Sequence, residues 1–220
     1  MIIGLLGFKG SGKGTVGEIL IKRGFHQLSF ASPVKDITSV MFNWPRNLLE
    51  GNTEESRIFR EKPDEFWSKQ FGEEFSPRKA LQLIGTEVGR NVFHTDFWII
   101  KMRQQLQDNT KNYVITDVRF PNELKMLREL GAIFICVHRG LSPHWYDIAA
   151  KANRGDVSAE KFMKERIQVH ESEWRWIQKD EFDYVIENNN TVEDLERQTI
   201  YCLTNSFGSN MMSEILEGAL

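Results

Sequence analysis

The chain has little cysteine, no long hydrophobic run and no excess charge of one sign. Its 220 residues include two cysteines, Cys136 and Cys202, whose spacing fits neither a metal site nor a redox motif, so we expect buried, reduced thiols in a cytoplasmic protein. The apolar start, MIIGLLGF, is too short to span a bilayer and follows no basic segment, which disfavours a membrane segment and a signal peptide. A formal net charge of −3 disfavours a surface built to bind nucleic acid.

The remaining composition is that of an ordinary globular protein. Hydrophobic residues make up 40% and charged residues 27%, which is enough apolar mass for a core. Apolar runs alternate with amphipathic stretches, and this alternation predicts an α/β fold with a mostly parallel sheet covered by helices on both faces. We expect strands at about 2–6, 26–30, 113–116, 132–137 and 184–186, and helices at about 16–20, 32–41, 76–93, 96–106, 122–130 and 192–203.

The stretch GFKGSGKGT, Gly7 to Thr15, nearly matches the phosphate-binding pattern G-x-x-x-x-G-K-[ST]. Gly7, Gly12 and Lys13 are in register, but Gly14 stands at the position of the Ser or Thr, and the threonine follows one residue later. A predicted strand precedes the loop and a predicted helix follows it, which is the context that a phosphate cradle needs. The alternative is a glycine-rich turn with an exposed lysine.

In such a cradle the backbone binds the phosphate. N–H groups would meet phosphate oxygens at the positive end of the following helix, from Gly10, Ser11, Gly12, Lys13, Gly14 and Thr15. Lys13 would bridge the β- and γ-phosphates of ATP. The order G-x-x-G-x-G-K-G-T resembles the adenylate-kinase form of this loop. With Gly14 in the usual hydroxyl position, Mg²⁺ would be held by water, the phosphates and a carboxylate elsewhere, with Thr15 nearby.

Two further segments carry charged groups suited to a substrate cleft. In SFASPVKD, residues 29–36, Lys35 and Asp36 lie in the first turn of a helix that follows a strand end. In SPRKALQLIGTEVGR, residues 76–90, positions four apart form a polar stripe beside an apolar one. The polar positions are Arg78, Gln82, Thr86 and Arg90, and the apolar ones are Leu81, Ile84, Val88 and Val92. Solvent-exposed charges are the alternative for both segments.

Arg78 and Arg90 lie too far apart to grip one phosphate. At ~1.5 Å per residue they are about 18 Å apart on a helix. One would therefore hold the acceptor's phosphate and the other the transferring group. Gly85 and Gly89 weaken the helix, which indicates close approach by a ligand or by another helix.

The stretch YVITDVRFPNE, residues 113–123, ends a predicted central strand at the edge where open α/β sheets bind ligands. Asp117 could hold Mg²⁺ there through water, and Arg119 could face phosphate; a structural Asp–Arg pair is the alternative. Arg139 follows the next strand and could reach the ATP phosphates or solvent. Among the aromatic residues, Trp98 is the best candidate for stacking on a base, with a place in the core as the alternative.

The order of these motifs, with DFW (96–98) and HESE (170–173), resembles the bacteriophage deoxynucleoside monophosphate kinases of the T-even type. The resemblance covers the chain except for about residues 43–75 and the last fifteen or so. It implies a P-loop kinase fold and ATP- and Mg²⁺-dependent conversion of dNMP to dNDP for phage DNA precursor synthesis in the host cytoplasm. It also allows a homodimer, and it assigns four residues to the cleft: Arg78, Arg90, Asp117 and Arg119.

We therefore expect one kinase domain over residues 1–204, followed by a tail over 205–220. Residues 43–75 are polar, aromatic and irregular, as in an excursion on the substrate side. Residues 141–175 have mixed charge and no clean period, as in a mobile lid, and His170 lacks convincing metal-ligand partners there. Two alternatives remain: a P-loop kinase that acts on a modified base in DNA or on another small acceptor, and a nucleotide-binding module without enzymatic activity.

Overall fold

The protein divides by its internal contacts into two units. The structure is a computed structural model that describes residues 1–167, 169–177 and 182–206. Unit 1 combines residues 1–28 with those from Gln105 onward, and unit 2 is the continuous stretch Ser29–Gln104. Over the described ranges, no helix is both long and apolar enough to cross a membrane. Most of the predicted tail, from residue 207, lies outside these ranges.

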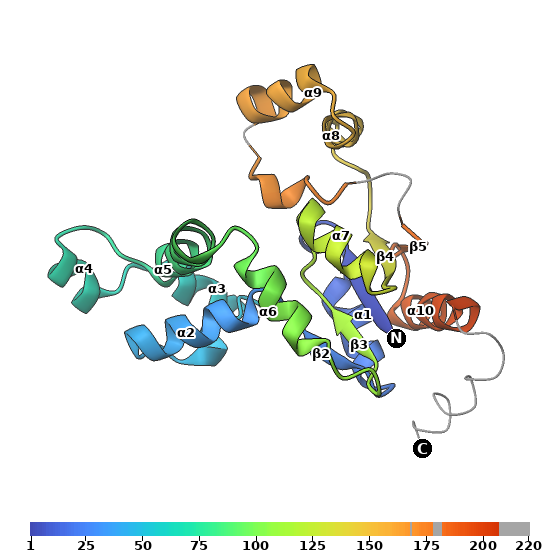
Figure 1. The fold of residues 1–220 in the computed structure, drawn as a ribbon, viewed down its shortest axis with the longest axis horizontal. Helices are drawn as coiled ribbons and strands as arrows, with labels where there is room; N and C mark the ends of the chain where they lie inside the picture. Colours follow the sequence, from blue (N-terminus) through green and yellow to red (C-terminus); the bar gives the residue numbers. More distant parts are fainter. Residues whose placement is uncertain (168, 178–181, 207–220) are drawn as a thin grey trace. The chain divides into compact units, whose positions relative to one another are not determined.

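Unit 1 is built on a five-stranded sheet in the order β2-β3-β1-β4-β5 (Figure 1). All of its strand pairs are parallel. The predicted α/β fold class is therefore confirmed, with strand bounds within two residues of the predicted ones. The strands are β1 (Ile2–Leu6), β2 (His26–Leu28), β3 (Tyr113–Ile115), β4 (Ile133–His138) and β5 (Tyr184–Glu187).

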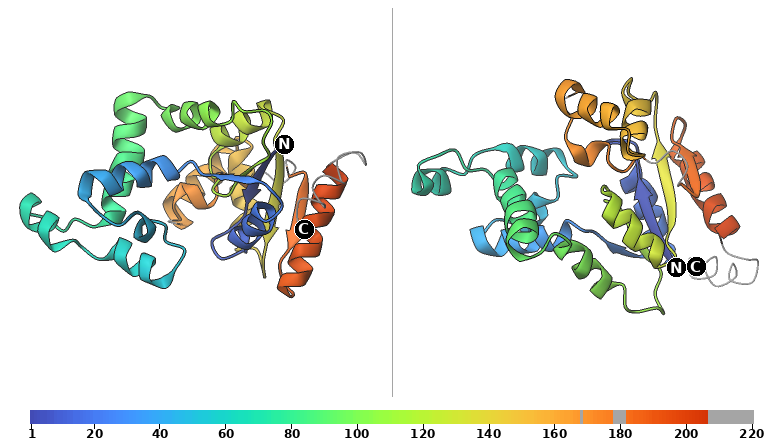
Figure 2. Two further views of the ribbon diagram at one scale, coloured as in Figure 1. Left: turned by 90° about the horizontal axis from the view of Figure 1, so that it is seen from below. Right: turned by 45° about the horizontal axis from the view of Figure 1, so that its top comes forward.

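Helices cover both faces of this sheet, as predicted. Side chains of α1 (Lys13–Ile21) and α10 (Val192–Ser206) share one buried apolar cluster with alternate residues of β1, β3, β4 and β5. Helix α7 (Pro121–Glu129) lies on the opposite face (Figure 2). The parallel strands thereby bring the chain segments after β1, β3, β4 and β5 to one edge.

The described part of the predicted lid is largely helical and lies within unit 1. It contains α8 (Tyr146–Asn153), α9 (Val157–Phe162), the short helix η3 (Met163–Ile167) and the 3₁₀ turn η4 (Glu171–Glu173). Met163 and Trp174 are fully buried. Asn153 ties the segment together, because its Nδ2 donates to the carbonyls of Trp174 at 2.8 Å and Ile177 at 2.9 Å. The segment therefore contains fully buried side chains and side-chain hydrogen bonds between its parts.

Unit 2 is helical. Its helices are α2 (Ser32–Phe42), η1 (Arg46–Leu49), α3 (Glu54–Glu61), α4 (Glu65–Phe71), α5 (Pro77–Gln82), η2 (Leu83–Phe93) and α6 (Phe97–Gln105). The prediction that residues 43–75 are irregular was wrong. Thr53 and Asp64 cap α3 and α4 by accepting the backbone N–H groups of Ser56 and Trp67, and these short polar caps start helices that the aromatic composition obscured. A buried cluster underneath contains Trp44, Leu49, Phe75 and Ala80.

The predicted helix over 76–93 changes type in the middle. From Leu83 to Phe93 it is a π-helix, in which each N–H bonds five residues back rather than four. Ile84 and Gly89, five apart, are therefore the buried positions. The predicted apolar stripe was wrong beyond Ile84, because Val88 is 40% exposed and Val92 72% exposed.

Gly89 lies against a tryptophan ring of α6. A Cβ added to Gly89 would be 2.6 Å from Nε1 of Trp98, and that nitrogen donates to the Gly85 carbonyl at 2.7 Å. A Cβ on Gly85 would instead meet Val34 at 3.6 Å, an ordinary contact. The sequence predicted close approach by a ligand or by another helix at these glycines. At Gly89 it is another helix, α6, that approaches.

We expect Gly89→Ala to lower the stability of the protein and Gly85→Ala not to lower it. The added methyl at Gly89 overpacks the site and should lower the free energy of unfolding by about 1–3 kcal/mol. At Gly85 the methyl fits, so the better helix propensity of alanine, worth up to ~1 kcal/mol, should leave stability unchanged or raised. Urea denaturation of both variants checks this, and an equal loss in the two would contradict the contact.

Candidate active site

The glycine-rich loop connects β1 to α1 and rests on the end of β4. Gly7 and Gly12 have positive φ angles of 135° and 106°, a region that other residues rarely adopt. A Cβ on Gly7 would also lie 2.2 Å from the Val137 carbonyl oxygen. Gly12 is the N-cap of α1 and no side chain caps that end, so the first N–H groups of the nine-residue helix are available to an anion.

Lys13, the first residue of α1, folds back over the loop. Its Nζ donates to the carbonyl oxygens of Gly7 at 2.6 Å and Phe8 at 2.8 Å. Burial and, next, the positive charge of Arg119 lower the pKa of Lys13 to about 8, while Glu173 acts in the opposite sense. Lys13, Arg119 and Glu173 therefore lie within electrostatic range of one another.

Arg119 is held between the loop after β3 and the predicted lid. Its Nη1 lies 2.9 Å from Oε1 of Glu173 and 3.3 Å from Oγ of Ser172. Its backbone N–H donates to Oε2 of Glu123 at 2.8 Å, and Glu123 is 2% exposed at the start of α7. Glu173 thus holds the guanidinium and Glu123 the backbone of Arg119, and sequence reasoning linked neither carboxylate to Arg119.

Asp117 and Arg139 follow β3 and β4 at the edge that also carries the glycine loop. Asp117 is half-buried, whereas Arg139 is exposed. Within the described part of the chain, no three His, Cys, Asp or Glu side chains gather as a metal site. In the HESE stretch, His170 Nδ1 lies 2.9 Å from Ser172 Oγ, and Glu171 pairs with Arg175.

Phe8, inside the loop, contacts through its ring the predicted lid and Trp176, the residue directly after it. The ring centroids of Trp145, Tyr146 and Trp176 lie 5.6, 6.1 and 5.0 Å from that of Phe8, all in edge-on arrangements. Such aromatic pairs add to the apolar area that they bury. The sequence signal was an aromatic residue within a glycine-rich loop, and it was overlooked.

In unit 2, the charges at the start of α2 form a network with η1. Lys35 Nζ lies 2.6 Å from Oε2 of Glu50, and Arg46 pairs with Asp36 at 2.5 Å and with Glu50. Burial alone would raise the pKa of Glu50, but hydrogen bonds from Lys35 and Arg46 outweigh it and lower that pKa. The Lys35 side chain is 14% exposed, so it is not an ordinary solvent-facing charge.

The predicted polar stripe remains accessible along most of its length. Arg78 pairs with Glu61 of α3, and its side chain is 42% exposed. Gln82 and Thr86 are exposed, and Arg90 is half-buried on the π-helix. Trp98 is 5% exposed, and its ring packs against Gly89 of η2. No face of the ring is free to stack on a base, so that prediction was wrong.

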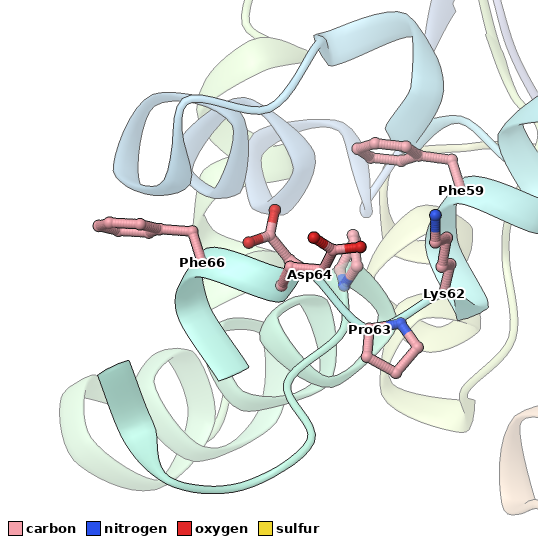
Figure 3. A pocket seen from close by; sticks show the side chains of 7 residues that line it. Phe59, Lys62, Pro63, Asp64 and Phe66 are labelled. Carbon is pink, nitrogen blue, oxygen red and sulfur yellow. The ribbon is translucent and has the colours of Figure 1, made fainter. Parts of the chain in front are cut away.

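A pocket that the sequence did not indicate also lies in unit 2 (Figure 3). It has a volume of about 380 Å³ and lies where α3 ends and α4 begins. One of its carboxylates, that of Asp64, is already engaged by the indole of Trp44 at 2.8 Å and the backbone of Trp67 at 3.0 Å. The lining residues are Phe59, Lys62, Pro63, Asp64, Glu65, Phe66 and Pro77, none of them a predicted site residue.

Comparisons with known proteins agree on one family. A family model described as "Deoxynucleotide monophosphate kinase" matches residues 49–147, and it begins inside the segment that the sequence resemblance left out. A chain of Acanthamoeba polyphaga mimivirus named "Putative deoxynucleotide monophosphate kinase" is 30% identical over 223 residues, 96% of this chain and 100% of the relative. The "Deoxynucleoside-5'-monophosphate kinase" of Escherichia phage T5 is 31% identical over 180 residues, 59% of this chain and 72% of the relative.

Among solved structures, a dephospho-CoA kinase from Campylobacter jejuni is similar with a TM-score of 0.47 and 16% identity, over 93% of this chain and 96% of that chain. The family assignment depends on the mimivirus relative, whose full length this chain matches. The chain belongs to the deoxynucleotide monophosphate kinase family.

Proposed function

We propose that this protein transfers the γ-phosphoryl group of ATP to a deoxynucleoside monophosphate and releases ADP and the diphosphate. The observation that carries the proposal is the glycine loop in a chain of this family: it ends at the uncapped start of α1 with Lys13 folded over it. This arrangement offers backbone N–H groups and one ammonium to a chain of phosphates.

ATP would lie with its phosphates over residues 10–15. On binding, Lys13 would exchange the carbonyls of Gly7 and Phe8 for the β- and γ-phosphate oxygens, which are better partners for a partly desolvated ammonium. Arg119 is close enough to lower the pKa of Lys13, which supports a role for it in neutralising charge on the same phosphates. Arg139 would contribute from the exposed turn after β4.

The residues present fit a magnesium ion. Asp117 and Thr15 are half-buried oxygen donors on segments that meet at one edge of the sheet. Mg²⁺ prefers such hard oxygen ligands, keeps several waters and is commonly bound by one or two carboxylates together with substrate phosphates. Asp117 would hold it through water. The ion would supply neutralisation of the charge that develops on the β- and γ-phosphates.

The acceptor would bind to unit 2, along the stripe of α5 and η2 and the start of α2. Arg78 would give up its ion pair with Glu61 and bind the acceptor's phosphate instead. The two planar N–H groups of a guanidinium match the oxygens of a phosphate as they match those of a carboxylate. The predicted acceptor side chains are Lys35, Asp36, Arg78, Gln82 and Thr86. Catalysis would consist of positioning and charge neutralisation, with no covalent intermediate.

An acceptor panel tests the proposal. The protein is incubated with γ-labelled ATP and Mg²⁺, with each dNMP in turn, with oligonucleotides that carry modified bases, or with no acceptor. We expect label in the deoxynucleoside diphosphates. Label in the oligonucleotides alone would indicate the DNA-modifying alternative, and nucleotide binding without any transfer would indicate a module that is not an enzyme.

The lowered pKa of Lys13 predicts a pH dependence. With a pKa of about 8, the ammonium is charged below this pH, and its attraction for phosphate is lost as the pH rises through it. We expect kcat/KM for ATP to fall by about tenfold per pH unit above about pH 8. The Lys13→Arg variant stays charged, so its kcat/KM for ATP should not fall in this pH range, whatever its absolute rate. A flat wild-type profile to about pH 9.5 would contradict the assignment.

A further inference from the structure

Asn188, the residue after β5, contacts the backbone of the phosphate loop. Its Nδ2 donates to the carbonyl oxygen of Ser11 at 2.8 Å, across 177 positions of the chain. A Cβ on Gly12 would lie 2.3 Å from the same Nδ2. The amide therefore presses against the Ser11–Gly12 peptide, with room there for a glycine only.

Asn188 is itself fixed by the sheet. Its backbone N–H donates to the carbonyl of His138 at 2.7 Å, which extends the β4–β5 ladder by one bond beyond the pair of His138 with Glu187. The next residue, Asn189, accepts the N–H of Gly140 through Oδ1 at 2.7 Å. The side chain of Asn188 thus projects from a rigid base at the carboxyl ends of β4 and β5.

The bond to Ser11 determines where the next N–H points. The structure contains no cis peptide among its described residues, and in a planar trans peptide the C=O and N–H point in opposite directions. With the Ser11 carbonyl turned toward Asn188, the Gly12 N–H points away from it. The Ser11 N–H is already bonded to the Phe8 carbonyl at 3.1 Å.

Ser11 supplies an independent sign that a ligand belongs here. The residue is 4% exposed, and its hydroxyl has no hydrogen-bond partner within the described ranges. A buried hydroxyl without a partner is costly. A phosphate oxygen, or a water that it orders, would satisfy it.

We propose that Asn188 is a positioning residue for nucleotide binding: its amide holds the Ser11–Gly12 peptide so that the Gly12 N–H is presented to a phosphate. The inference rests on the proposed function only in that the loop binds nucleotide phosphates, and the identity of the acceptor does not matter. The competing explanation is that Asn188 merely forms the turn at residues 188–190.

Asn188→Asp separates these explanations. Aspartate keeps the size and the turn preference of asparagine, but it replaces the donor with an oxygen that repels the Ser11 carbonyl. A turn-forming role would therefore survive the change, and the positioning role would not. Asn188→Ala removes the bond without adding repulsion. Asn189→Asp is the matched control, because it adds the same charge one residue away and keeps the acceptor for Gly140.

The test is the affinity for MgADP, measured by titration calorimetry without any acceptor. We expect a loss of about fivefold for Asn188→Ala, the usual effect of one hydrogen bond, and of more than about tenfold for Asn188→Asp. Asn189→Asp should stay within about twofold. In steady-state assays the KM for ATP should rise while the KM for dNMP does not.

Unchanged MgADP affinity in a folded Asn188→Asp protein would overturn the inference, even if its melting temperature fell. Should that variant not fold, Asn188→Ala decides by the same criterion. If the wild-type protein binds MgADP but phosphorylates no dNMP, the proposed acceptor is wrong and the role of Asn188 can still be measured.

Discussion

Lys13→Ala is expected to lower the rate of dNDP formation by roughly 10²–10³-fold, the loss typical when one preorganised charge-stabilising group is removed. The Lys13 ammonium is held over the loop by two carbonyls, and in the proposed reaction it would contact the phosphates that develop charge during transfer. The fold should survive, because the variant removes a charge that burial already disfavours. Circular dichroism and initial rates with saturating dNMP check both statements.

Lys9→Ala is the matched control for Lys13→Ala. Lys9 belongs to the same loop and carries the same charge, but it is exposed and lies outside residues 10–15, which are proposed to bind the phosphates. We expect the Lys9→Ala variant to form dNDP at a rate within about twofold of wild type, since isolated surface charges contribute little to stability or binding. Near wild-type turnover in Lys13→Ala would show that the loop is not the phosphate cradle.

Arg78→Ala is expected to raise the KM for dNMP by roughly 10–100-fold and to change the KM for ATP far less. A hydrogen bond to a charged group is worth about 1.5–3 kcal/mol, and a contact made equally in the ground and transition states affects KM rather than kcat. Arg78→Lys should not restore binding, because an ammonium lacks the planar fork. Lys79→Ala, which removes the neighbouring charge paired with Glu73, is the control.

Arg90→Ala should instead lower kcat more than it changes either KM, as expected for a group near the transferring phosphoryl. The change from α- to π-helix at Leu83 lies between the two arginines, so their directions do not follow from one helical period. Steady-state kinetics on both variants distinguish the roles. Equal effects of Arg78→Ala on ATP and dNMP would contradict its assignment to the acceptor.

The elements predicted well are those whose signals are local. A short apolar run before glycines predicted β1, the loop and α1, and the same alternation located the other strands of the sheet. The family was predicted from motifs in order and is confirmed; the T-even type remains a prediction, as do the roles of the individual site residues. Local pattern was sufficient where neighbouring residues decide the structure.

The features missed depend on distant partners. The π-helix forms where Gly89 admits the ring of Trp98, and no period in residues 83–93 reports that contact. Glu173 reaches Arg119 across 54 positions and Asn188 reaches Ser11 across 177. Each of these side chains has an ordinary alternative in its own neighbourhood, so only the folded chain shows which partner it takes.

The discontinuous course of unit 1 has a consequence for how the protein is made. Strand β1 pairs with β3 and β4, as in the pairs of Ile3 with Val114 and Ile133. It can therefore form these pairs only after more than a hundred further residues have been synthesised. At ~5–20 residues per second this delay is roughly 5–20 s. Unit 2 is continuous, and the cluster around Trp44 can form while the ribosome is still translating. The glycine loop gains its contact with Asn188 only after 177 further residues beyond Ser11 have been synthesised.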